Sequence, residues 1–208
     1  MVSRGQYLER PALVPVGREV LEGLWHRGSA SPPLLVVPPP PGAGSMDHVV
    51  CAELAWAMAR AQRPVLRFNF RGVGASQGAR GDAGSRREDA AAALQLLRQN
   101  TGRTEVAVAA VGDSADTALQ LAREHPGIIA VVLVSPPLGV LARPAEVPLL
   151  CIAGEDEPGR AVLPEAASRA GGRLQVVPRT DARFQRNLPE VGRLAARWLE
   201  ARANHPES

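Results

Sequence analysis

Short, almost continuously apolar runs alternate along the chain with longer stretches whose apolar residues recur every three to four positions. The short runs end at Gly, Pro or Asp, which is typical of strands that are covered by helices on both faces. The longer stretches have the spacing of amphipathic helices. Their alternation predicts an α/β domain with a mostly parallel sheet flanked by helices on both faces.

The predicted elements fill most of the chain. The parallel strands are expected at residues 34–37, 65–70, 106–111, 128–134, 149–153 and 174–177. The helices are expected at residues 47–60, 86–98, 114–124 and 188–203. Residues 19–25 are predicted to form a strand of an antiparallel edge hairpin. The resulting division is an N-terminal extension over 1–17, one domain over 18–203 and a frayed tail over 204–208.

Composition narrows the class of protein. With 208 residues, 45% of them apolar and 22% charged, the chain suits a single globular domain. The net charge is +3 and every basic residue is Arg, but the arginines are scattered and only seven residues are aromatic (three Trp, one Tyr and three Phe), so no nucleic-acid partner is expected. No apolar run approaches a membrane span or a signal peptide, which predicts a cytoplasmic protein with no membrane partner. Cys51 and Cys151 are distant from each other in sequence and belong to no metal-ligand motif, so no metal site is expected and both are predicted to be buried.

The first candidate for chemistry is Ser114. The predicted strand 106–111 runs directly into Gly112-Asp113-Ser114-Ala115-Asp116 and then into a helix, which is the context of a nucleophile elbow. The match to Gly-x-Ser-x-Gly is incomplete because Asp116 stands at the second Gly. A cap of the following helix by Asp113 or Ser114 is the alternative.

A second motif, Arg67-Phe-Asn-Phe-Arg-Gly-Val-Gly-Ala-Ser-Gln-Gly78, is similar to the Arg-Phe-Asn-Phe-Arg-Gly-Val-Gly-x-Ser-x-Gly signature of small bacterial α/β-hydrolases. The resemblance continues at residues 44–50, 82–89 and 148–156 and covers roughly residues 18–200. It implies the minimal α/β-hydrolase fold without a lid domain. It also implies that Ser114 is the nucleophile.

The resemblance makes Asp156 the best match for the triad acid, with Glu155 and Glu157 as neighbours that could substitute. The histidine of the family falls on Ala182, or on Arg183 if the register slips by one. Neither side chain can accept a proton at neutral pH.

His48 is the remaining candidate base, because it lies in the first turn of a predicted helix and could face the same cleft. A helix-capping or solvent-facing His48 is the alternative. In the segment where the family provides an oxyanion donor, Pro38–Pro41 offer no N–H groups. The Ala115 N–H and Gly42 are therefore the expected donors.

The cleft is predicted to include binding residues from the segment 44–50 and from the signature, namely Asp47, Arg71, Gly72 and Gly74. The spacing of Gly72 and Gly74 does not complete a dinucleotide fingerprint, so no cofactor is expected.

The leading hypothesis is a hydrolase-fold protein with eroded machinery, non-catalytic or very weak, that binds a small acyl-containing molecule or a protein. The alternative is a working carboxylesterase or thioesterase that uses Ser114 with His48 as an unusual base. A third interpretation makes Pro32–Pro41 a polyproline ligand for a partner, provided that it is not buried beside the sheet. The exposed sheet edge could also support a homodimer, which the sequence does not decide.

Overall fold

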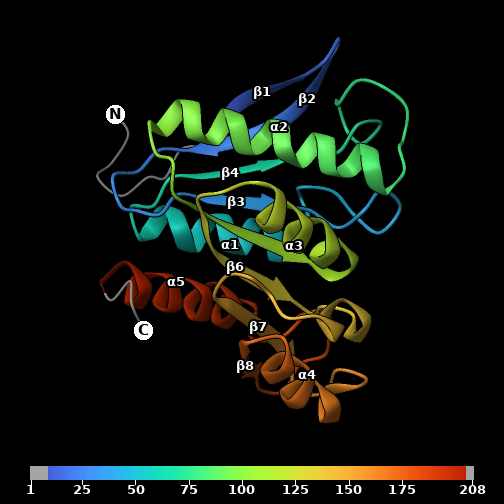
Figure 1. Cartoon of the computed structure of the whole chain (residues 1–208), viewed down its shortest axis with the longest axis vertical. Helices are drawn as coiled ribbons and strands as arrows, with labels where there is room; N and C mark the ends of the chain where they lie inside the picture. The colour runs from blue at the N-terminus through green and yellow to red at the C-terminus, as the bar shows by residue number, and fades with distance from the viewer. Residues whose placement is uncertain (1–8, 205–208) are drawn as a thin grey trace.

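The computed structural model describes residues 9–204, which form one eight-stranded sheet with helices on both faces (Figure 1). The strands are β1 (Arg10–Val16), β2 (Glu19–His26), β3 (Leu34–Val37), β4 (Val65–Phe68), β5 (Val106–Val111), β6 (Ile128–Val134), β7 (Leu149–Gly154) and β8 (Gly172–Val177). The helices are α1 (Val49–Arg60), α2 (Ala83–Thr101), α3 (Ala115–Glu124), α4 (Leu163–Arg169) and α5 (Leu188–Asn204). Short 3-10 turns occupy Gly112–Ser114, Leu138–Ala142 and Arg160–Val162.

The strand order is β1-β2-β4-β3-β5-β6-β7-β8, and all pairs from β4 to β8 are parallel. The pairs β1/β2 and β2/β4 are antiparallel, so the predicted edge hairpin is confirmed. Its first strand, Arg10–Val16, lies within the predicted N-terminal extension and belongs to the sheet, which corrects the domain boundary at residue 18. Helix α4, only seven residues long, was not predicted. Residues 205–208 of the predicted tail lie outside the described part, whereas Asn204 ends α5.

Two apolar clusters form the core, one on each face of the sheet. Helices α2, α3 and α4 pack on one face, and α1 and α5 pack on the other (Figure 1). The interior strands β3, β5 and β7 are buried along their whole length, which explains why their sequences are continuous apolar runs. Cys51 and Cys151 are free and buried, as predicted, and burial raises the pKa of each thiol to about 12.

The proline-rich segment is part of this core. Leu34–Val37 is the central strand β3, and Pro32, Pro33, Pro38 and Pro39 are buried. A partner that reads a polyproline helix needs the segment exposed, so the ligand interpretation of Pro32–Pro41 is wrong. The exposed end of the segment is a tight turn. The Ala43 N–H donates to Pro40 O at 2.9 Å, and Gly42 within this turn has a φ of +97°.

The parallel strands end together at one edge of the sheet. Val111 pairs with Val134 and Val134 with Ile152, and Gly154 pairs with Val177. The segments that follow β5, β6, β7 and β8 are therefore neighbours. In open parallel sheets this carboxyl edge is where ligands bind.

Candidate functional site

The turn after β5 is built around Gly112. Its φ of +58° is in the left-handed region, and a Cβ added there would meet no atom within 4 Å. A nucleophile elbow places its nucleophile at the apex of a sharp, strained turn, with the side chain exposed above the sheet. In this protein the residue with the left-handed backbone and with open space for a side chain is Gly112, and a glycine provides no nucleophile.

Ser114 lies two residues further on, inside the transition from the 3-10 turn to α3. Its backbone is helical (φ −73°, ψ −2°) and the residue is 1% exposed. Its Oγ has no hydrogen-bond partner among residues 9–204. The hydroxyl is therefore hydrogen-bonded to neither an imidazole nor a carboxylate of the described chain, and its oxygen accepts no capping bond from an N–H group of α3.

The two expected oxyanion donors differ in their surroundings. The Ala115 N–H donates to the Gly112 carbonyl and so closes the 3-10 turn. Gly42 is exposed in the turn between Pro40 and Ala43. An N–H that is already paired within the turn is not available for a developing oxyanion, so the geometry disfavours Ala115 in that role.

Three acidic residues follow β7, and their side chains lie in different environments. Asp156 is exposed and lines a pocket of about 280 Å³ with the loop after β8, while its N–H donates to Thr180 O at 2.9 Å. Glu155 is exposed and accepts from the Arg179 N–H at 2.8 Å. Only Glu157 turns back toward the sheet edge.

Glu157 is half-buried, and one of its oxygens accepts from both Ser135 Oγ at 2.8 Å and the Gly154 N–H at 3.1 Å. Burial raises its pKa, the two hydrogen bonds oppose that rise, and the charge of Asp181 adds to it. Ser135 follows β6 with φ +49°, a conformation that is uncommon for a residue with a side chain. Of the three acids after β7, Glu157 is thus the one whose carboxylate is bonded at the sheet edge, and it accepts a hydrogen bond from the Ser135 hydroxyl.

The loop after β8 rests directly on the loop after β7. A Cβ on Gly154 would lie 2.4 Å from Thr180 O and 2.6 Å from Asp181 O, so only glycine permits this approach. Ala182 and Arg183, the two positions for the missing histidine, are exposed in this loop. No titratable base stands there.

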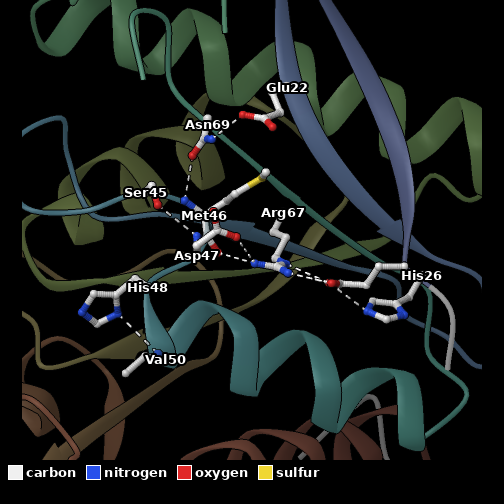
Figure 2. Close-up of polar contacts among 10 residues, drawn as sticks. Glu22, His26, Ser45, Met46, Asp47, His48, Val50, Arg67 and Asn69 are labelled. Carbon is white, nitrogen blue, oxygen red and sulfur yellow. Dashed lines mark hydrogen bonds and ion pairs between the residues drawn. The ribbon is translucent and has the colours of Figure 1, made fainter. Parts of the chain in front are cut away.

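His48 is the N-cap of α1, which is the alternative interpretation of that residue. Its Nδ1 accepts from the Val50 N–H at 3.3 Å, and Figure 2 shows the imidazole turned toward this helix end. Burial lowers its pKa. Because Nδ1 is engaged in the cap and no bond joins His48 to Ser114, the described contacts do not bring the predicted triad of Ser114, Asp156 and His48 together.

The binding residues expected around the signature have structural partners. Arg67 is buried in β4, where its guanidinium donates to both oxygens of Glu9 at 2.9 and 2.8 Å and to Asp47 Oδ1 at 3.0 Å (Figure 2). The same group donates to Met46 O at 2.6 Å. His26 lies 3.1 Å from Glu9, and burial is the main cause that lowers its pKa. Arg67 thus connects the start of β1 to the loop before α1, and the Asp47 carboxylate is one of its partners.

Asn69, two residues after Arg67, forms a second connection between these loops and the edge hairpin. Its side chain accepts from the Met46 N–H at 2.8 Å and donates to Glu22 at 2.8 Å (Figure 2). Ser76 donates to the Asn69 carbonyl at 2.8 Å and accepts from the Glu22 N–H at 2.9 Å. These bonds fix the loops after β3 and β4 to the edge hairpin.

Arg71 forms the third connection. Its side chain donates to Asp89 Oδ1 at 2.8 and 2.6 Å, and its backbone N–H donates to the other oxygen at 2.9 Å. Asp89 is fully buried in α2, and these bonds raise the pKa of Arg71. Gly72 and Gly74 have φ +70° and +58°, and a Cβ on Gly74 would lie 2.5 Å from Glu22 Oε2. The expected binding residues Asp47, Arg71, Gly72 and Gly74 therefore all have a structural part in holding the loops.

Within 9–204, no group of three or more His, Cys, Asp or Glu side chains could hold a metal ion. In the same range, no helix combines the length and apolar composition that crossing a bilayer requires.

Comparison with known proteins is consistent with this geometry. A model of the family described as serine aminopeptidase, S33, matches residues 43–196. The fold is similar to a protein of unknown function from Agrobacterium tumefaciens (TM-score 0.80, 22% identity, 95% of this chain and 97% of that chain). It is also similar to an α/β serine hydrolase homologue from Coxiella burnetii (TM-score 0.81, 21% identity, 91% of this chain and 97% of that chain). A third similar structure is dienelactone hydrolase from Anabaena variabilis (TM-score 0.78, 21% identity, 94% of this chain and 98% of that chain). These likenesses establish an α/β-hydrolase fold, and no separate lid domain interrupts residues 9–204. A search of curated proteins found no match.

Proposed function

Because this chain belongs to the serine aminopeptidase S33 family of α/β hydrolases, we propose that it is a member without working serine-hydrolase machinery, which acts by binding. Its partner is a small acyl-containing molecule or a protein. The fold supplies a carboxyl edge suited to ligands, while function is decided by the side chains that line it.

One observation carries the proposal. The left-handed apex of the turn after β5 is Gly112, whereas the serine of the motif is 1% exposed and has no partner among the described residues. A serine hydroxyl is a weak nucleophile unless an adjacent base removes its proton. Ser114 has neither an adjacent base nor access to a substrate.

The position of the base supports the same conclusion. Ala182 and Arg183 are exposed beside Asp181, and neither can exchange a proton at neutral pH. A hydrolase that loses a triad member retains only about 10³- to 10⁴-fold acceleration over water. This chain lacks the base and offers no exposed serine at the apex, so we expect its turnover of esters to be negligible.

Labelling with an active-site-directed fluorophosphonate tests the proposal. We expect no adduct on wild type at pH 7 or pH 9, and no difference between wild type and Ser114→Ala in hydrolysis of short acyl esters. A label that disappears in Ser114→Ala together with ester turnover would overturn the proposal. So would a label on Ser135, because it would reveal a nucleophile held by Glu157 instead.

Restoration distinguishes the two candidate positions of the nucleophile. If Ser114 held that position, Ala182→His alone would supply the missing base and raise activity. If Gly112 occupies the nucleophile position, activity can rise only when Gly112→Ser is combined with Ala182→His. We expect the ester hydrolysis rate of this double variant to exceed that of Ala182→His at least about tenfold, which is less than a positioned general base usually contributes. Equal activity of the two variants would contradict the assignment of the apex to Gly112.

A further inference from the structure

At the opposite end of the sheet, a cavity of about 550 Å³ lies between the edge hairpin and the carboxyl end of α2. Its lining includes Arg10, Trp25, Arg27, Ser29, Thr101 and Arg103. Pro64 just before β4 and Arg103 just before β5 place it at the amino edge, away from the Gly112 turn. The volume is in the range of small-molecule sites.

The charge of this cavity is one-sided. Three arginines line it and no lining residue is acidic. Within residues 9–204, none of Arg10, Arg27 and Arg103 forms an ion pair, whereas the adjacent Glu9 is engaged by Arg67 and His26. Arginines that line one cavity without a carboxylate give it a positive potential, which attracts an anion.

The segments that carry these side chains are held in place by the backbone. Arg10 and Trp25 are directly paired across β1 and β2, so their side chains share one face of the sheet. The N–H groups of Ser29 and Ala30 both donate to Gln62 O at 2.8 Å. A Cβ on Gly28 would lie 2.2 Å from that oxygen, so the wall after β2 depends on glycine.

The end of α2 does not require the arginines for its own carbonyls. Thr101 Oγ1 donates to Leu97 O at 2.7 Å, and the Gly102 N–H donates to Arg98 O at 2.8 Å. Arg103 follows this capped end and faces the cavity. Its charge is therefore free to act on a ligand.

From this arrangement we propose that the cavity binds a small phosphorylated compound with a planar ring, of the nucleoside monophosphate class. The phosphate is held by Arg10, Arg27 and Arg103, with Ser29 and Thr101 on the lining. Arginine pairs with phosphate through paired N–H donors, and the half-buried ring of Trp25 provides an apolar face for a planar group. The site is independent of the carboxyl edge and of whether hydrolysis occurs there.

Calorimetric titration with adenosine 5′-monophosphate tests the site, with inorganic phosphate and adenosine as partial probes. We expect the monophosphate to bind at least tenfold more tightly than phosphate, roughly the 1.4 kcal/mol of one aromatic contact. Adenosine should show no binding. Binding of adenosine as tight as that of the monophosphate would overturn the proposal.

Variants then locate the site. Each of Arg10→Gln, Arg27→Gln and Arg103→Gln is expected to weaken binding at least about fivefold, the effect of one charge-assisted contact. Trp25→Leu should remove the preference for the monophosphate over phosphate. Arg143→Gln, which removes an exposed arginine elsewhere, is the matched control and should change affinity less than about twofold.

Two results would refute the assignment. One is unchanged affinity in all three cavity arginine variants with their melting temperatures at the wild-type value. The other is an oligoadenylate that binds more than tenfold more tightly than the monophosphate and is equally weakened by Arg143→Gln, which would indicate a diffuse nucleic-acid surface.

Discussion

The signature region and the carboxyl edge lie in the same sheet, yet their polar groups differ in kind. Around Arg67, Asn69 and Arg71 the side chains have specific partners at 2.6 to 3.1 Å. At the edge, the turn apex has no side chain and the Ser114 hydroxyl has no described partner. The difference teaches that the most recognisable motif of the chain maintains the scaffold, whereas the turn after β5 lacks the partnered side chains that chemistry would need.

The largest expected loss of folding stability follows substitution of Arg71. Arg71→Met leaves the carboxylate of Asp89, 0% exposed, buried without its cation, which should lower the free energy of unfolding by about 3–5 kcal/mol. Arg71→Met/Asp89→Leu should recover more than half of that loss. Urea denaturation measures both. Arg143→Met is the control, and a loss at Arg71 no larger than in this control would contradict the structural role of the signature.

Asn69 gives the next largest effect. Asn69→Leu leaves the buried Met46 N–H without its acceptor and should destabilise by about 1–3 kcal/mol in the same assay. Gln99→Leu on the exposed side of α2 serves for comparison and should stay within about 0.5 kcal/mol of wild type. Equal effects of the two substitutions would mean that the Asn69 bonds do not stabilise the loops.

The same serine-to-alanine change should destabilise the protein in the signature region but not at the turn after β5. Ser76→Ala removes a buried hydroxyl that makes two bonds and should destabilise by about 1–2 kcal/mol. Ser114→Ala removes a buried hydroxyl without a described partner, so the protein should be unchanged or up to about 1 kcal/mol more stable. Thermal melts followed by circular dichroism measure both, and a marked loss in Ser114→Ala would reveal a hidden partner.

The smallest effect concerns pH. Burial holds the pKa of His48 below its ordinary 6.5, so between that lowered value and 6.5 the unfolded chain binds more protons than the folded one. Stability should therefore fall as pH drops through 6.5, and protonated Nδ1 no longer accepts from Val50. His48→Asn keeps a capping oxygen that does not titrate and should flatten the slope, leaving the part due to His26. A slope identical to that of wild type would show that His48 is not responsible.

His48→Ala separates the loss of the helix cap from the loss of the titrating group. This variant removes the cap at every pH and should lower stability by about 1 kcal/mol near neutrality, where His48→Asn should match wild type. If the two variants behave alike at pH 7.5, the Val50 contact contributes nothing measurable to α1.

Much of the architecture followed from the sequence, because burial on both faces leaves a continuous apolar run that is readable locally. The strands β3, β5 and β6 have the predicted bounds, and the edge hairpin was anticipated from one of its strands. The first strand was missed because its two prolines and exposed Leu13 give no apolar pattern. Such a strand is defined by its partner rather than by its own residues.

The site was harder to predict, since its geometry depends on backbone conformation. Asp156 was preferred as the acid, whereas the inward carboxylate belongs to Glu157, which the sequence offered only as a neighbour that could substitute. For the turn, Gly112 was itself the signal, because a left-handed apex favours glycine. The presence of a serine two residues later drew the interpretation away from it.

The sequence by itself determined the alternation of strands and helices, the buried cysteines and the absence of a histidine at 182 and 183, because these depend on residue identity and local periodicity. Only the tertiary structure decided which residue stands at the turn apex, which carboxylate faces inward, and that three arginines distant in sequence line one cavity. Those features arise from strand register and loop packing, which bring together residues that no local pattern relates.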